Sequence, residues 1–179
     1  WAMVMGLSND ESDRLLMGTL AEEGAHVLFY TAEGQLLRID GDTINPQQTG
    51  SASGVAGIRL RKGDELIGST IIPDGDDNGD AYQVIVASRR GYVHRFPLPE
   101  ISVKGRNTLG VRCLNVTETT GQVGGLEVGK DEDIDIYLAD GRRQRVPMAE
   151  IPATSRATQG DRLIDDPDKV DIDCVVILR

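Results

Sequence analysis

Arginine supplies most of the positive charge in this chain and recurs at a fixed distance from glycine. Of the 19 lysine and arginine residues, 15 are arginine. Arg38, Arg95 and Arg145 each stand four residues after a glycine. A guanidinium group binds phosphate through paired hydrogen bonds and keeps its charge at neutral pH. Arginines repeated in this way predict a surface that binds a polyanion.

The glycines that precede these arginines belong to a repeat of about 50 residues. Segments 26–39, 83–96 and 133–146 each contain an alternating apolar run, a two-residue turn ending in glycine, and a second run carrying an arginine. A later glycine follows in each repeat, and Arg106 and Arg156 stand four residues before the last two of these. The repeated turn and downstream glycines are Gly34, Gly91, Gly141, Gly54, Gly110 and Gly160.

The elements that position these residues are predicted to be short β-strands. Alternation of apolar and polar residues indicates half-buried strands, and glycine at the turn permits a tight hairpin. Four antiparallel strands in about 50 residues make one propeller blade, which buries its faces only against neighbouring blades. We therefore expect an all-β repeat domain of about three blades with an incomplete ring: 24–73, 80–129 and 131–179, with 1–23 as the remnant of a preceding blade.

Composition excludes several classes of protein. The chain has 179 residues, 39% hydrophobic and 27% charged, which argues against both disorder and a membrane protein. No export signal is visible, so we expect a cytoplasmic protein. The net charge of −10 argues against a uniformly basic nucleic-acid binder, so the distribution of charge must decide. Because the chain opens at Trp1, we expect a longer parent protein.

Other chemistry is weakly supported. Cys113 and Cys174 lie among apolar residues and are interpreted as core residues. Segment 74–79 resembles the start of a calcium loop, but its twelfth position is Ile85, where calcium requires a bidentate glutamate. The two histidines lack companion ligands. We predict no catalytic residue and no metal site.

The last two repeats carry a family resemblance. The stretches GYVHRFPLPEISVKGRNTLGVRCLNV and GRRQRVPMAEIPATSRATQGDRLI resemble the repeat of the C-terminal domain of DNA gyrase A and of its topoisomerase IV counterpart. Segment 34–60 is a weaker match. The resemblance implies a β-pinwheel, a propeller-like disc whose blades exchange strands with their neighbours. It also implies a non-catalytic domain that binds and wraps double-stranded DNA.

The same resemblance implies partners and cofactors. The parent would be a type IIA topoisomerase that uses ATP and Mg²⁺, but no cofactor is expected in this chain. Expected partners are the separate ATPase chain and the remaining domains of the gyrase A protein or its counterpart. Gyrases are marked by a box rich in glutamine, arginine and glycine, which does not occur here. Either the box lies in a missing blade, or the parent resembles topoisomerase IV, or wrapping is weakened.

We expect DNA phosphates to contact basic residues at equivalent repeat positions, arranged as an arginine-rich rim without reading the base sequence. The predicted contacts are Arg38, Arg89, Arg90, His94, Arg95, Lys104, Arg106, Arg142, Arg143, Arg145 and Arg156. The alternative function is a propeller that binds proteins through acidic segments 73–80, 129–136 and 163–173. Open blade edges also favour self-association, in which two copies would complete a disc of six blades.

Overall fold

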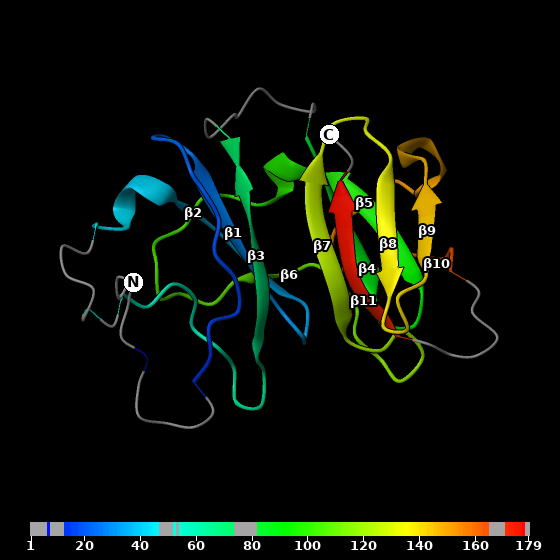
Figure 1. Ribbon diagram of the computed structural model, residues 1–179, viewed down its shortest axis with the longest axis horizontal. Helices are drawn as coiled ribbons and strands as arrows, with labels where there is room; N and C mark the ends of the chain where they lie inside the picture. Colours follow the sequence, from blue (N-terminus) through cyan, green and yellow to red (C-terminus); the bar gives the residue numbers. More distant parts are fainter. Residues whose placement is uncertain are drawn as a thin grey trace.

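The chain folds into three antiparallel sheets, here called blades 1 to 3 (Figure 1). The computed structural model describes residues 7, 13–46, 52, 54–73, 82–164 and 171–177. Blade 1 has the strand order β3 (Leu66–Ile72), β1 (His26–Thr31), β2 (Gln35–Asp40) and β6 (Val111–Arg112). Blade 2 has the order β7 (Val123–Gly129), β4 (Gln83–Ser88), β5 (Tyr92–Pro97) and β10 (Asp161–Arg162). Blade 3 contains β11 (Ile172–Ile177), β8 (Ile134–Leu138) and β9 (Arg143–Val146).

The three alternating segments form hairpins, as predicted. Strand β1 pairs with β2, β4 with β5, and β8 with β9, all antiparallel. The turn glycines Gly34, Gly91 and Gly141 have φ angles of 77°, 86° and 87°. Residues with a Cβ atom rarely adopt such angles, so glycine is required at each turn. A three-residue 3₁₀ helix follows each hairpin: η1 (Gly41–Thr43), η4 (Leu98–Glu100) and η5 (Met148–Glu150).

The second and third repeats each give one short strand to the preceding blade. Strand β6 belongs to the second repeat but pairs with β2, opposing Leu36 with Val111. Strand β10 belongs to the third repeat but pairs with β5. We expected one repeat to supply all four strands of its own sheet, and this expectation is wrong. The repeats exchange strands, as the family resemblance implied. Gly110 and Gly160 permit the crossing, because a Cβ atom on Gly160 would lie 2.6 Å from the carbonyl oxygen of Val93 and one on Gly110 would meet the backbone of Leu36.

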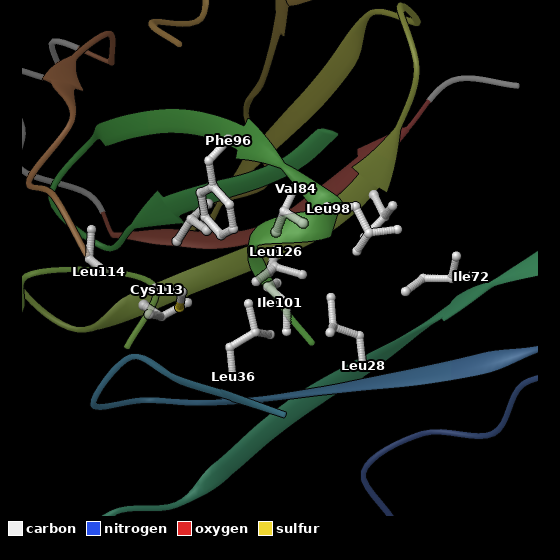
Figure 2. Close-up of a cluster of buried hydrophobic side chains, with 13 residues drawn as sticks. Leu28, Leu36, Ile72, Val84, Phe96, Leu98, Ile101, Cys113, Leu114 and Leu126 are labelled. Atoms are coloured by element: carbon white, nitrogen blue, oxygen red, sulfur yellow. The ribbon is translucent and has the colours of Figure 1, made fainter. Parts of the chain in front are cut away.

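The core consists of aliphatic layers between adjacent blades. Figure 2 shows the layer between blades 1 and 2, where Leu28 and Leu36 face Val84 and Phe96. A second layer joins blades 2 and 3. Complete burial of one such side chain contributes about 1.5–3 kcal/mol, so the contacts between blades stabilise the array more than any single hairpin could. Cys113 is fully buried in the first layer, as predicted.

Strands β3, β7 and β11, one from each blade, lie together in the middle of the molecule, where β3 contacts β7 and β7 contacts β11 (Figure 1). Within the described part of the chain, no helix is long and apolar enough to cross a membrane. The described residues also contain no group of three potential metal ligands. The calcium-like segment 74–79 and much of the acidic segments lie outside the described residues, as does the side chain of Cys174.

Candidate nucleic-acid interface

Two of the repeated arginines join blades instead of facing solvent. Arg38 on β2 is only 2% exposed, and its Nη1 donates to the carbonyl oxygen of Ile101 at 3.5 Å. Arg95 on β5 is half-buried, and its Nε donates to the carbonyl oxygen of Ile151 at 2.9 Å. Both acceptors belong to the 3₁₀ turn of the following repeat, where each isoleucine ends the helix. The burial of this guanidinium group argues against the prediction that Arg38 contacts DNA.

The arginines that precede the downstream glycines donate hydrogen bonds to the preceding repeat. Arg106 donates from Nε to the carbonyl oxygen of Thr43 and from Nη1 to that of Ala56, both at 3.1 Å. Arg156 donates from Nη1 to the carbonyl oxygen of Arg112 at 3.3 Å. Both guanidinium groups therefore form hydrogen bonds between repeats, two from Arg106 and one from Arg156. This explains why the spacing from arginine to glycine recurs without requiring DNA.

His94 is also inside the protein. Its side chain is fully buried, its Nε2 lies 3.0 Å from the carbonyl oxygen of Cys113, and its ring stacks on Phe96. Burial lowers the pKa of His94, because the apolar surroundings disfavour the charged imidazolium. The enclosure of the ring between blades 1 and 2 argues against the prediction that His94 contacts DNA.

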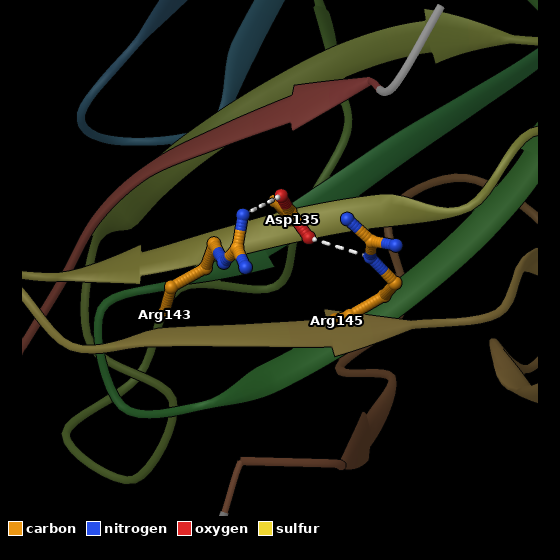
Figure 3. Close-up of polar contacts among 3 residues, drawn as sticks. All are labelled: Asp135, Arg143 and Arg145. Carbon is orange, nitrogen blue, oxygen red and sulfur yellow. Dashed lines mark hydrogen bonds and ion pairs between the residues drawn. The ribbon is translucent and has the colours of Figure 1, made fainter.

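Basic residues of the third blade are exposed but paired with carboxylates. Arg143 and Arg145 each lie 3.2 Å from a different oxygen of Asp135 (Figure 3). At the hairpin tip, Arg142 pairs with Asp140 at 2.6 Å, and hydrogen bonds from Arg142 lower the pKa of that carboxyl group. The three arginines keep about half of their side-chain surface exposed, but their net charge is reduced.

Two clefts are each lined by three basic side chains. The blade 2 cleft, of about 630 Å³, is lined by Arg89 and Arg90 from the hairpin and by Arg162 from the exchanged strand β10. The blade 1 cleft, of about 310 Å³, is lined by Arg61, Lys62 and Arg112. Each cleft thus lies between the hairpin of one blade and the strand donated by the next repeat.

The clefts are equivalent in construction. In the blade 1 cleft, the carbonyl oxygen of Gly34 accepts a hydrogen bond of 2.8 Å from the residue after Arg112. In the blade 2 cleft, that of Gly91 accepts one of 3.0 Å from the residue after Arg162. Neither Arg112 nor Arg162 was among the predicted contacts. The signal that could have found them is an arginine two residues after the repeated downstream glycine.

Among the described residues that line each cleft, three basic side chains accompany two carboxylates, which are Glu118 and Asp171 in the blade 2 cleft and Glu33 and Asp64 in the blade 1 cleft. The Asp171 carboxylate is 3.8 Å from Arg89. The Nε of Arg89 is buried without a hydrogen-bond partner in the protein. In the blade 1 cleft, the carboxylate of Asp64 accepts hydrogen bonds from Thr31 Oγ1 at 2.8 Å and from a backbone amide at 3.0 Å. Each cleft can therefore bind an anion through several guanidinium or ammonium donors.

Comparison with known proteins identifies the repeat. The family model described as the DNA gyrase C-terminal domain, a β-propeller, matches residues 25–73, 82–123 and 145–172. The chain belongs to the DNA gyrase C-terminal domain family. The DNA gyrase A protein of Deinococcus deserti is 30% identical over 168 residues, which cover 92% of this chain and 20% of that relative. The gyrase A protein of Aminobacterium colombiense is 32% identical over 170 residues, with coverage of 93% and 20%. The chain thus spans about a fifth of these relatives.

Solved structures of the family share the fold. The C-terminal domain of DNA topoisomerase IV superposes with a TM-score of 0.85 at 21% identity, covering 98% of this chain and 52% of that chain. A DNA gyrase A C-terminal domain gives the same TM-score at 16% identity, with coverage of 98% and 57%. The all-β, propeller-like architecture and the family predicted from the repeats are confirmed.

Proposed function

We propose that this chain is a non-catalytic domain that binds and wraps double-stranded DNA for a type IIA topoisomerase. In this proposal the two clefts bind backbone phosphates, while ATP hydrolysis and strand passage occur in other domains and in a separate ATPase chain. The observation that supports the proposal is that the equivalent arginines Arg112 and Arg162 line a cleft beside the hairpin of two successive blades. In a chain with a net charge of −10, each of these clefts is lined by three basic side chains and two carboxylates among the described residues.

Phosphate contacts suit a wrapping surface. Binding of basic groups to phosphates releases counterions, which gives affinity independent of sequence and strongly dependent on salt. Smooth bending of 20–30 base pairs costs about 1–6 kcal/mol, so a single contact would not hold curved DNA. Contacts repeated from blade to blade offset this cost. Arginines at the clefts can bind phosphate oxygens without contacting base edges, so affinity should vary little with sequence.

The test compares two double charge reversals. The first, Arg112→Glu with Arg162→Glu, changes one residue in each cleft. The control, Arg14→Glu with Arg59→Glu, changes the net charge equally at exposed positions outside the clefts. Affinity for linear duplexes of unrelated sequence is measured by fluorescence anisotropy over a range of salt concentrations. The cleft variant is expected to lower the slope of log K against log salt by about 0.9 for each lost phosphate contact.

Equal losses in the two variants would show that net charge alone governs binding and would reject the clefts as the site. Unchanged binding in the cleft variant would do the same. Failure of the native chain to bind duplex at low salt would reject the DNA-binding function itself. A protein partner that remains bound after nuclease treatment would then favour the protein-interaction function.

A further inference from the structure

The blade 2 cleft takes its basic side chains from two different repeats. Arg89 and Arg90 belong to the hairpin of the second repeat, whereas Arg162 lies on β10, the short strand that the third repeat donates to blade 2. The blade 1 cleft is divided in the same way, with Arg112 on the donated strand β6. Each cleft is therefore complete only while a donated strand lies beside the hairpin.

The hairpin side of the blade 2 cleft is held by hydrogen bonds within its own repeat. The backbone amide of Arg89 donates to the carbonyl oxygen of Gln122 at 2.8 Å, and that of Arg90 donates to the carbonyl oxygen of Thr120 at 3.3 Å. The side chain of Arg90 also donates from Nη1 to the carbonyl oxygen of Glu118. These contacts do not involve the third repeat, so they can keep both arginines at the cleft when the donated strand is detached.

The other side of this cleft is attached by fewer contacts. Strand β10 forms the edge of blade 2 (Figure 1), and both of its residues, Asp161–Arg162, are exposed. Beyond the strand, the amides of Leu163 and Ile164 donate to the carbonyl oxygen of Gly91 at 3.0 and 3.2 Å. The side chain of Ile164 is buried. A short, exposed edge strand opens locally at a lower free energy than the strands of the core.

Attachment of β10 brings a third guanidinium group to a cleft that already has two. Among the described residues that line it, the three arginines accompany two carboxylates. The Nε of Arg89 is buried, and no described residue accepts a hydrogen bond from it. Guanidinium groups in one cleft repel each other, whereas a phosphate group between them attracts each one and accepts hydrogen bonds from both sides.

We propose that a DNA phosphate in the blade 2 cleft bridges the hairpin of the second repeat and the strand donated by the third, so that DNA binding holds the exchanged strand in place. The inference rests on the proposed function, because it requires the cleft to bind duplex. A phosphate that needs Arg162 together with Arg89 or Arg90 binds the exchanged form in preference to the form in which β10 is detached. Such a ligand lowers the population of the detached form by the factor 1 + [L]/Kd. DNA bound along successive clefts thereby strengthens the array around which it bends.

Hydrogen exchange tests this linkage at the amides of Leu163 and Ile164, because their hydrogen bonds to Gly91 break when β10 opens. Exchange is followed by NMR with and without a linear duplex. At a duplex concentration of about 100 times Kd, exchange at both amides is expected to slow by about 100-fold. The amide of Thr154 donates to the carbonyl oxygen of Arg95 at 2.9 Å and joins the same two repeats outside the cleft. It should slow far less.

Two matched variants separate bridging from binding alone. Arg162→Gln removes the guanidinium group of the donated strand, so saturating duplex should no longer slow exchange at Leu163 and Ile164. Arg112→Gln makes the same change in the blade 1 cleft and should leave the slowing in blade 2 intact. Without duplex, Arg162→Gln should exchange at the native rate. Faster exchange in that state would show that Arg162 holds the strand by itself, and this would overturn the proposal.

The remaining outcomes distinguish this inference from the proposed function. If the native chain binds duplex but exchange at Leu163 and Ile164 does not change, the inference is wrong and the proposed function stands. The same conclusion follows if the slowing persists in Arg162→Gln. If the native chain does not bind duplex, both are rejected. Circular dichroism checks the folding of the variants, and the comparison of the native chain with and without duplex tests the inference even if a variant does not fold.

Discussion

The division of the arginines into blade-joining and cleft residues predicts opposite effects for Arg95 and Arg162. Truncation by Arg95→Ala removes one charged hydrogen bond, the 2.9 Å contact between Nε and the carbonyl oxygen of Ile151. The flanking backbone hydrogen bonds at 2.9 Å remain. Loss of a hydrogen bond to a charged group costs about 1.5–3 kcal/mol. A loss of about 2 kcal/mol corresponds to about 4–8 °C in Tm for a domain of this size.

Arg162 is exposed on β10, so Arg162→Ala should change the free energy of unfolding by less than about 0.5 kcal/mol. It should nevertheless lower the salt slope of duplex binding by about 0.9. Urea unfolding followed by circular dichroism and the anisotropy titration are run on both variants. Arg95→Lys is a useful companion, because it keeps the charge but loses the planar Nε donor. The reasoning is refuted if Arg95→Ala weakens DNA binding without loss of stability, or if Arg162→Ala unfolds the domain.

Three further predictions concern buried groups and turns. Burial lowers the pKa of His94, so the unfolded chain binds a proton below about pH 6.5 that the folded chain does not. Stability should therefore fall by up to about 1.4 kcal/mol per pH unit as pH decreases below this value, and unfolding titrations of His94→Leu should lack that component. Gly91→Ala should destabilise the fold more than Gly141→Ala. Both glycines have positive φ, but only Gly91 lies against the segment that follows the exchanged strand β10. Equal losses of Tm in the two variants would contradict this. Burial raises the pKa of Cys113 to about 12, so its thiol should react with iodoacetamide at about pH 8 only after unfolding. The reaction is followed in a Cys174→Ser background. Rapid alkylation of Cys113 in the folded protein would contradict this.

Much of the fold could be predicted from the spacing of residues. Alternating apolar runs around Gly34, Gly91 and Gly141 specified the hairpins, because strand periodicity and a turn with positive φ are local requirements. The pairing of β6 with β2 and of β10 with β5 could not be read from alternation. A two-residue strand has too few side chains to show a period, and its partner lies in another repeat. Only the family resemblance indicated the exchange.

The candidate site was predicted in part. The basic residues at the hairpin of blade 2, Arg89 and Arg90, do line a cleft. Their role as DNA contacts stays a prediction. The cleft arginines of β6 and β10 were not predicted. The repeated spacing of four residues after each turn glycine pointed instead to Arg38 and Arg95, and these two join blades. Arg38 and Arg95 occupy equivalent positions and donate to equivalent carbonyl oxygens. A guanidinium group can donate to a carbonyl oxygen or to a phosphate, so the repeated position alone does not show which acceptor it has.

The sequence by itself determined the repeat, the hairpins, the glycines that permit close crossing, and the membership of a family. The tertiary structure alone decided which cations remain accessible. Arg38 and Arg145 occupy the same place in the repeat, yet the first is buried by a following blade and the second is half exposed beside Asp135. The physical reason is that local geometry depends on neighbours in the chain, whereas desolvation depends on whatever packs against the finished sheet.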